Sequence, residues 1–250
     1  MSARPIYQFY AELDGYEPAI WRRFQVTDNV TVARLAYVLM TLFEMTASHL
    51  FCFEQMNNDF LVAMPSSLSE IGLAVRSKRR KRITDMDIIR YEIPDEGCFD
   101  FDSMTEIRDA TDFTLKQALP FPGCRLSFWY DFGDDWRVSV DLENIVHDEA
   151  LPGKELPRVL EGGGFGIVED CGGIDGLMKL AKAYKKKKGA AYEEFREWLG
   201  VDELDMESFD MNDMNFRLKK IPRIYMQIYE QGVSPTQRSE NLIERAYLKR

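Results

Sequence analysis

The clearest pattern of apolar and polar positions lies in residues 126–142, whose sequence is LSFWYDFGDDWRVSVDL. Side chains alternate in character along both halves of this stretch, and in a strand successive side chains point to opposite faces. The apolar set comprises Leu126, Phe128, Tyr130 and Phe132 in the first half and Trp136, Val138, Val140 and Leu142 in the second. Between the halves, Gly133 tolerates a positive φ, and Asp134 and Asp135 can hydrogen-bond their own backbone. The pattern therefore predicts a β-hairpin with one buried face.

The same alternation predicts strands earlier in the chain, and apolar residues at helical spacing predict helices on both sides of the hairpin. The expected strands cover residues 6–13, 20–26, 49–54 and 60–64. The expected helices cover residues 32–44, with Thr31 as N-cap, and residues 114–119, 174–188, 192–199, 211–220 and 224–231. Residues 83–94 and 98–110 fit either a strand or a helix, and residues 143–157 and 161–173 are expected to be connections.

This order of elements predicts an α+β protein, with a mainly antiparallel sheet around the central hairpin and helices packed on one side. We expect one domain over residues 1–220 and a helical C-terminal extension over residues 221–250.

Composition and charge limit the kinds of molecule that the protein is expected to bind. The chain has 45% hydrophobic residues and a formal net charge of −10, which is typical of an acidic globular protein. Its negative field disfavours membrane surfaces and weakens nucleic-acid binding outside a local basic patch. No window approaches the ~18 uncharged apolar residues of a membrane span. The four cysteines form no CxxC pair, and with only two histidines there is no zinc-ligand spacing. We therefore expect a cytoplasmic protein without a membrane partner.

A dense basic run could provide such a local patch. Six of the seven residues from 76 to 82 are basic: Arg76, Lys78, Arg79, Arg80, Lys81 and Arg82. Cations this close together can contact several phosphates and release their counterions, which favours a nucleic-acid contact. The alternative is a solvated loop, or a loop that pairs with the acidic stretch at residues 202–213.

Carboxylates in two separate stretches form the candidate catalytic or metal site. The hairpin turn and the sequence EDCGG at residues 169–173 supply Asp131, Asp134, Asp135, Glu169 and Asp170, and His49 is a candidate general base. If the two stretches meet, their oxygens could hold a divalent cation that activates water or binds phosphate. The alternative is that these acids only shape turns and a helix N-terminus. No other cofactor is predicted.

Two further groups of residues allow a functional and a structural interpretation. Cys171 lies near a predicted helix start, where the dipole could lower its pKa, but neighbouring acids oppose this. Aromatic residues and arginines are mixed on the predicted strands at Trp21, Arg22, Arg23, Trp129, Trp136 and Arg137. This mixture could stack bases and contact phosphates. The alternative is that the tryptophans form core and the arginines pair with Asp131 or Asp141 across the sheet.

The order of several motifs resembles the plasmid pRiA4b ORF-3-like proteins, which also occur as passengers in insertion sequences. The motifs are PAIWRRFQV (18–26), TVARLAYVLMTLF (31–43), SHLFCFE (48–54), TLKQAL (114–119), YDFGDDWR (130–137), EDCGG (169–173), YEEFREWLG (192–200) and FDMNDMNFRL (209–218). The resemblance spans residues 5–220 and implies a single α+β domain. It implies no established reaction, cofactor or partner, and it suggests a mobile-element context by association only.

The chain departs from the family pattern at positions that could carry chemistry. Many members have a histidine where this sequence has Val138. Many also have two cysteines and two prolines ahead of the EDCGG-like motif, at the places of Val159, Gly166, Ile167 and Val168. A metal or acid–base role built on those residues would be absent or changed in this chain.

Two functional hypotheses follow from the sequence. The first is a non-enzymatic binding or accessory protein that contacts nucleic acid or another protein, with the basic run as its main support. The alternative is a divalent-metal-assisted hydrolase or phosphate-acting enzyme that uses the clustered carboxylates. The C-terminal extension could also mediate self-association.

The binding hypothesis predicts that replacing the six cations of residues 76–82 by alanine weakens nucleic-acid binding and reduces its salt sensitivity. Fluorescence anisotropy with a labelled oligonucleotide at two salt concentrations measures both effects. Binding like that of the wild type in this variant would contradict the hypothesis.

Overall fold

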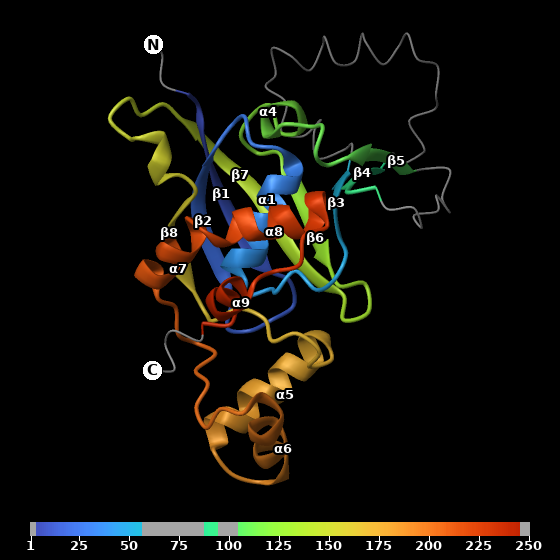
Figure 1. Ribbon diagram of the computed structural model, residues 1–250, viewed down its shortest axis with the longest axis vertical. Helices are drawn as coiled ribbons and strands as arrows, with labels where there is room; N and C mark the ends of the chain where they lie inside the picture. The colour runs from blue at the N-terminus through green and yellow to red at the C-terminus, as the bar shows by residue number, and fades with distance from the viewer. Residues whose placement is uncertain (1–3, 57–87, 95–104, 246–250) are drawn as a thin grey trace.

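The computed structural model describes residues 4–56, 88–94 and 105–245, and its centre is an eight-stranded sheet (Figure 1). The strand order is β5-β4-β3-β6-β7-β1-β2-β8. The strands are β1 (Ile6–Leu13), β2 (Trp21–Thr27), β3 (Phe51–Met56), β4 (Ile88–Glu92), β5 (Thr105–Asp109), β6 (Arg125–Tyr130), β7 (Trp136–Val146) and β8 (Arg158–Gly163). All neighbours pair antiparallel except β4 and β5. The predicted α+β class is confirmed.

The predicted hairpin is β6 and β7, which pair from Arg125 opposite Asp141 to Tyr130 opposite Trp136. Its alternating apolar side chains are fully buried, with one exception. Phe132 lies in the turn and is 45% exposed, so its predicted place on the buried face is wrong. Strand β7 also continues beyond residue 142, because β1 pairs with it as far as Val146. This part of the expected 143–157 connection is therefore strand.

The turn of the hairpin differs from the expected one. Positive φ angles fall on Asp131 (53°) and Asp135 (54°) and not on Gly133. The Gly133 amide instead donates to Asp131 Oδ1 at 3.0 Å, and the Asp135 amide donates to the Asp131 carbonyl at 2.8 Å. Aspartate tolerates the left-handed region because its short side chain can hydrogen-bond the nearby backbone.

Helix α1 (Val32–Leu42) is the first core element, and α8 (Ile221–Gln231) packs on it across one face of the sheet (Figure 1). Thr31 caps α1 as predicted, with its side chain accepting from the Arg34 amide. The remaining helices are α4 (Leu115–Ala118), the 3₁₀ turn η1 (Gly153–Glu155), α5 (Gly173–Lys186), α6 (Ala190–Leu199), α7 (Met211–Leu218) and α9 (Gln237–Ile243). Helices α5 and α6 project from one end of the sheet. Among the described residues, none of the helices combines the length and apolar character needed to cross a membrane.

Residues 161–163, which were expected to belong to a glycine-rich connection, are the end of strand β8, and their glycines explain why they can be a strand. A Cβ on Gly162 would lie 2.8 Å from the Phe209 ring, and one on Gly163 would lie 2.9 Å from Trp21 Nε1. The missing side chains let β8 approach β2 beneath these rings. In the two ambiguous segments, residues 88–92 and 105–109 are strands. The expected strand at 60–64 and the basic run at 76–82 lie outside the described residues.

The outer edge of β8 is covered by a side chain of α7. The Val159 amide donates to Asn215 Oδ1 at 2.9 Å, and Asn215 Nδ2 donates to the Val159 carbonyl at 3.1 Å. The side-chain amide of Asn215 thus hydrogen-bonds the Val159 backbone groups with which a further strand would pair. Such coverage protects a sheet edge from pairing with another chain.

The two arginines of the RR pair in β2 point to opposite faces and have different roles. Arg22 is fully buried, and its guanidinium donates to the carbonyls of four residues: Trp21 (2.8 Å), Leu42 (2.9 Å), Gly163 (2.7 Å) and Phe165 (2.7 Å). Burial lowers its pKa to about 9, so the group remains charged at neutral pH. Arg23 points to the opposite face of the sheet, which we call the open face, and pairs with Glu143 and Glu161.

The other aromatic and arginine residues divide in the same way between the two faces. Trp136 is buried in the core, whereas Trp129 lies on the open face below Arg137, whose guanidinium is 4.0 Å from the ring centroid. Arg137 pairs with Asp135 and Glu54. Ion pairing therefore accounts for Arg23 and Arg137, although the predicted partner Asp141 pairs with Arg125. Arg23, Arg125 and Arg137 of this face are therefore already paired with carboxylates.

Replacing Arg22 by methionine should lower the free energy of unfolding by about 3–5 kcal/mol, because buried carbonyls of several segments lose their donor. The neighbouring Arg23→Met change should cost only about 1 kcal/mol or less, since its ion pairs are solvated. Urea unfolding of both variants makes the comparison. Equal losses would contradict the assigned role of Arg22.

Candidate metal centre

The hairpin turn and the EDCGG loop meet at one end of the sheet. The Gly172 amide donates to Asp134 Oδ2 at 3.3 Å. A Cβ on Gly173 would lie 2.5 Å from the Asp134 carbonyl oxygen, and Gly173 has a positive φ of 66°. Glycine at this position therefore permits the close approach of the two motifs. The structure brings together two stretches that are separated by more than thirty residues, Asp134 and Gly172 being 38 positions apart.

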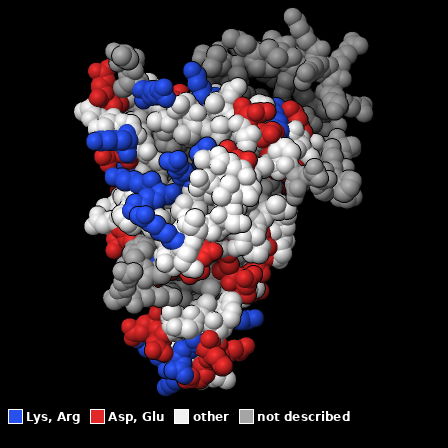
Figure 2. Space-filling view, in the orientation of Figure 1, with Lys and Arg blue, Asp and Glu red and all other residues white. Residues whose placement is uncertain are grey.

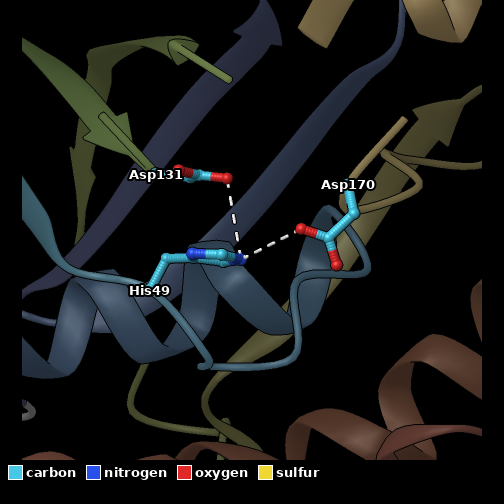
Figure 3. Close-up of side chains that lie close together, drawn as sticks. All are labelled: His49, Asp131 and Asp170. Atoms are coloured by element: carbon cyan, nitrogen blue, oxygen red, sulfur yellow. Dashed lines mark ion pairs between the residues drawn. The ribbon is translucent and has the colours of Figure 1, made fainter. Parts of the chain in front are cut away.

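His49, Asp131 and Asp170 converge where these loops meet the start of β3 (Figure 3). His49 Nε2 lies 3.6 Å from Asp131 Oδ2 and 3.8 Å from Asp170 Oδ1. One ligand atom from each residue lies within 4.8 Å of the other two. The side chain of Asp131 is 12% exposed, that of His49 29% and that of Asp170 74%, so the cluster opens to solvent on the Asp170 side.

Local backbone geometry positions the two carboxylates. Asp131 directly follows β6 and has a positive φ, and its Oδ1 accepts a hydrogen bond from the Gly133 amide, which leaves Oδ2 toward His49. Asp170 has a positive φ of 60° just before α5. Left-handed geometry at a non-glycine residue carries strain, and it persists here at both acids of the cluster.

Tyrosines from two elements hold the ring and the backbone of His49. Its ring lies edge-on to Tyr130 of β6, with centroids 5.7 Å apart and planes at 88°. The Tyr229 hydroxyl of α8 donates to the His49 carbonyl. Nearby, the Tyr225 hydroxyl donates to the Met45 carbonyl at 2.5 Å. Helix α8 therefore fixes the backbone of the segment that carries His49.

Glu169 acts as the anchor of the same segment. Its Oε1 accepts from the Thr46 amide at 2.8 Å and the Tyr130 hydroxyl at 2.6 Å. Its Oε2 accepts from the hydroxyls of Thr46 and Ser48, the latter at 2.9 Å. Burial, followed by the charge of Glu169, raises the pKa of Tyr130, so the phenol remains a donor. Both oxygens of Glu169 are thus used to hold residues 46–48 against the end of β6.

The remaining sequence candidates take other positions. Asp134 binds the Gly172 amide, as described above, and Asp135 pairs with Arg137 on the open face at 2.9 Å. His147 is exposed after β7. Of the six acidic-site candidates, the structure therefore places three in the cluster, and Glu169 and Asp134 beside it.

Cys171 follows Asp170 directly but has a different chemical character. Burial, and next the Asp134 carboxylate, raise the pKa of its thiol to about 12. The thiol is therefore protonated at neutral pH, which is the opposite of what a nucleophilic cysteine needs. The suggested effect of the helix dipole does not overcome burial and the two neighbouring acids.

The cluster has the donor set and spacing of a divalent-cation site. Two ligands about 2.1 Å from a tetrahedral ion lie roughly 3.4 Å apart, close to the two distances measured from His49. One imidazole nitrogen with two carboxylate oxygens suits Zn²⁺ or Mn²⁺ better than Ca²⁺, which prefers oxygen alone. Three protein ligands leave further coordination positions for water or substrate.

The fold and the meeting of its two most specific motifs define one class of protein. Residues 5–214 match the family described as plasmid pRiA4b ORF-3-like protein, and the chain belongs to this family, as its motifs predicted. It is similar to the uncharacterised protein y4hQ of Sinorhizobium fredii (strain NBRC 101917 / NGR234), with 26% identity over 204 residues, 81% of this chain and 85% of that one.

A solved structure shows the same fold. The crystal structure of a protein of unknown function, MM3350 from Methanosarcina mazei Go1, matches with a TM-score of 0.62 and 23% sequence identity. The match covers 85% of this chain and 98% of the other.

The role of Glu169 can be tested against its neighbour in the chain. Glu169→Ala should lower the free energy of unfolding by about 2–4 kcal/mol, because four donors lose their acceptor. Asp170→Asn should cost less than about 0.5 kcal/mol in metal-free buffer, since that side chain is largely exposed and asparagine tolerates the same left-handed backbone. Urea unfolding compares the two, and similar losses would rule out the anchoring role.

Proposed function

We propose that the protein is a divalent-metal-assisted hydrolase or phosphate-acting enzyme, with His49, Asp131 and Asp170 as the metal ligands. The observation that carries the proposal is the convergence of these three side chains from three separate segments, at the junction of the two most specific family motifs. A bound cation would lower the pKa of a coordinated water and polarise a substrate oxygen.

The ligands and the residues that support them have distinct parts in this proposal. Asp131 is the most buried ligand and is fixed by the hairpin turn. Asp170 faces solvent at the open side, where water and substrate enter. Glu169 and Tyr229 both hold the segment that carries His49, which keeps the imidazole within reach of both carboxylates. The carboxylate of Glu169 adds negative charge that favours a cation.

The proposal predicts that Zn²⁺ or Mn²⁺ stabilises the protein after treatment with a chelator. At 100 times the dissociation constant the gain is about 2.7 kcal/mol, or a rise in melting temperature of roughly 5–10 °C for a chain of this size. Single changes of His49→Ala, Asp131→Asn or Asp170→Asn should abolish the rise. Differential scanning fluorimetry with a metal titration measures it.

The double variant Asp134→Asn, Asp135→Asn is the matched control, since it removes two nearby carboxylates outside the cluster. It should retain most of the rise, whereas a site built on the hairpin turn alone would lose it. If no divalent ion raises the melting temperature of the wild-type protein, the proposal is wrong. If the ion binds but metal-dependent hydrolysis of p-nitrophenyl phosphate and ester substrates is undetectable, only the enzymatic part fails.

The other expectations from the sequence stay as proposals of their own. The first functional hypothesis, a non-enzymatic binding protein, rests on residues 76–82, which lie outside the described residues. A cytoplasmic location rests on the cysteine usage. The boundary at residue 220 rests on the end of the family motifs, and limited proteolysis would test it.

A further inference from the structure

A cavity of about 740 Å³ lies at the end of the sheet from which α5 projects. Three segments surround it: the loop between β1 and β2, one side of α5, and residues 203–207 after α6. Its volume lies in the range of sites that bind small ligands. The cavity shares no residue with the cluster of His49, Asp131 and Asp170, so it is a site of its own.

Hydrogen bonds fix the segment after α6 as one wall of the cavity. The Tyr184 hydroxyl of α5 donates to the Val201 carbonyl at 2.9 Å, which holds the start of this segment against the helix. The Phe165 amide donates to the Met206 carbonyl at 3.0 Å, which holds its end against the glycine loop after β8. The wall is therefore in place without a ligand, and a preformed site loses less entropy on binding.

Much of the cavity lining is apolar. Met178 and Ala181 lie three residues apart on α5 and are therefore neighbours on one side of the helix. The two other segments contribute Pro18, Leu204 and Met206. The Met178 side chain is 40% exposed, and its flexible thioether can adapt to the shape of a ligand. The cavity thus suits a ligand with an apolar group.

A buried hydroxyl without a hydrogen-bond partner also lines the cavity. Tyr16 is only 5% exposed, and within the described parts of the chain its hydroxyl makes no hydrogen bond. Burial, and next the charge of Glu207, raise the pKa of the phenol, so it stays protonated and able to donate. A buried donor without an acceptor is costly, and an oxygen atom of a ligand would remove that cost.

Charged side chains of both signs surround the cavity. Figure 2 shows acidic and basic residues interspersed over α5 and α6, with no large area of one sign. At the cavity itself, Lys185 pairs with Glu207 at 3.3 Å, and Lys187 pairs with Glu203 at 2.5 Å. A polyanion or a polycation would therefore meet repulsion as well as attraction at this site.

Three other charged side chains of the lining have no ionic partner. Among the residues that the structure describes, Lys182 of α5, Glu17 of the β1–β2 loop and Asp205 form no ion pair. Asp205 Oδ1 instead accepts from the Glu207 amide at 2.9 Å, which shapes the local turn. Lys182 and Glu17 thus leave one cation and one anion for a ligand. A complementary ligand carries a carboxylate and an ammonium group.

We propose that this cavity binds a short peptide with free termini and apolar side chains. The peptide carboxylate pairs with Lys182, and the peptide ammonium pairs with Glu17. A backbone carbonyl of the peptide accepts from the Tyr16 hydroxyl, while an apolar side chain contacts Met178. A free amino acid carries both charges on one carbon atom, whereas a peptide separates them, as charges on two different walls require.

Other ligand classes match fewer of these features. A nucleotide lacks the ammonium group, and a polyamine lacks both the carboxylate and the apolar side chain. No metal ion takes part in the proposed binding, so the proposal stands or falls separately from the candidate metal centre. All titrations below therefore use chelator-treated protein.

Isothermal titration calorimetry of the full chain with trileucine tests the proposal. Trileucine blocked at both ends should bind at least ~10-fold more weakly than trileucine with free termini, because both charge-assisted contacts are lost. Lys182→Met should weaken the binding of trileucine by ~5-fold or more but should not affect trileucine amide, which lacks the carboxylate. Glu17→Gln should likewise weaken trileucine and spare N-acetyl trileucine, which lacks the ammonium group.

Tyr16→Phe separates ligand binding from stability. The change should weaken trileucine binding by ~3-fold or more, because the ligand loses a hydrogen-bond donor. It should not lower the melting temperature, because the hydroxyl has no partner to lose within the described parts of the chain. A lower melting temperature with unchanged binding would show that the hydroxyl is structural and would contradict the proposal.

The matched control is Lys179→Met, which removes the same charge from an exposed position of α5 outside the cavity. This control should bind trileucine like the wild type. The proposal is overturned if the wild type shows no heat of binding with trileucine at about 5 mM, a threshold for very weak affinity. It is also overturned if the blocked peptide binds equally well, if Lys179→Met weakens binding as much as Lys182→Met, or if AMP or spermidine binds more tightly than trileucine.

Discussion

A single buried guanidinium connects the segments on which the rest of the structure depends. Arg22 projects from β2 into the core and binds carbonyls at the end of α1, in β8 and in the glycine loop after it. Burying a charge is costly unless each donor finds an acceptor, so these carbonyls must converge on the arginine together. The helix, the edge strand and the loop are thus fixed relative to one another by the requirements of one side chain.

The hydrogen bonds of Arg22 also help to position the candidate metal centre, because the segments that carry its ligands begin close to the bound carbonyls. The loop fixed at Phe165 leads within five residues to Glu169 and Asp170, and the carbonyl of Leu42 immediately precedes the segment that carries His49. The two ligand-bearing segments therefore start from points held by the same guanidinium. Glu169 then joins them directly by accepting hydrogen bonds from Thr46 and Ser48.

Periodic patterns predicted the fold more completely than the site. The hairpin, β1, β2 and α1 follow from alternation and helical spacing, since each buries a regular face. Strand β8 was missed because its glycines reflect close approach to Trp21 and Phe209, which no local pattern encodes. The sequence named His49, Asp131 and Asp170 as candidates, but their convergence depends on long-range pairing. The supporting residues Thr46 and Tyr229 carried no sequence signal, because their contacts with Glu169 and with the His49 carbonyl join positions far apart in the chain.

The phenols of α8 have an evolutionary consequence. The family match ends at residue 214, whereas Tyr225 and Tyr229, which hold the backbone at Met45 and His49, come after it. The candidate ligands thus lie inside the matched region, whereas the tyrosines that hold the His49 segment lie outside it. A substitution in α8 can therefore move the backbone that carries His49 without changing any residue of the matched family region.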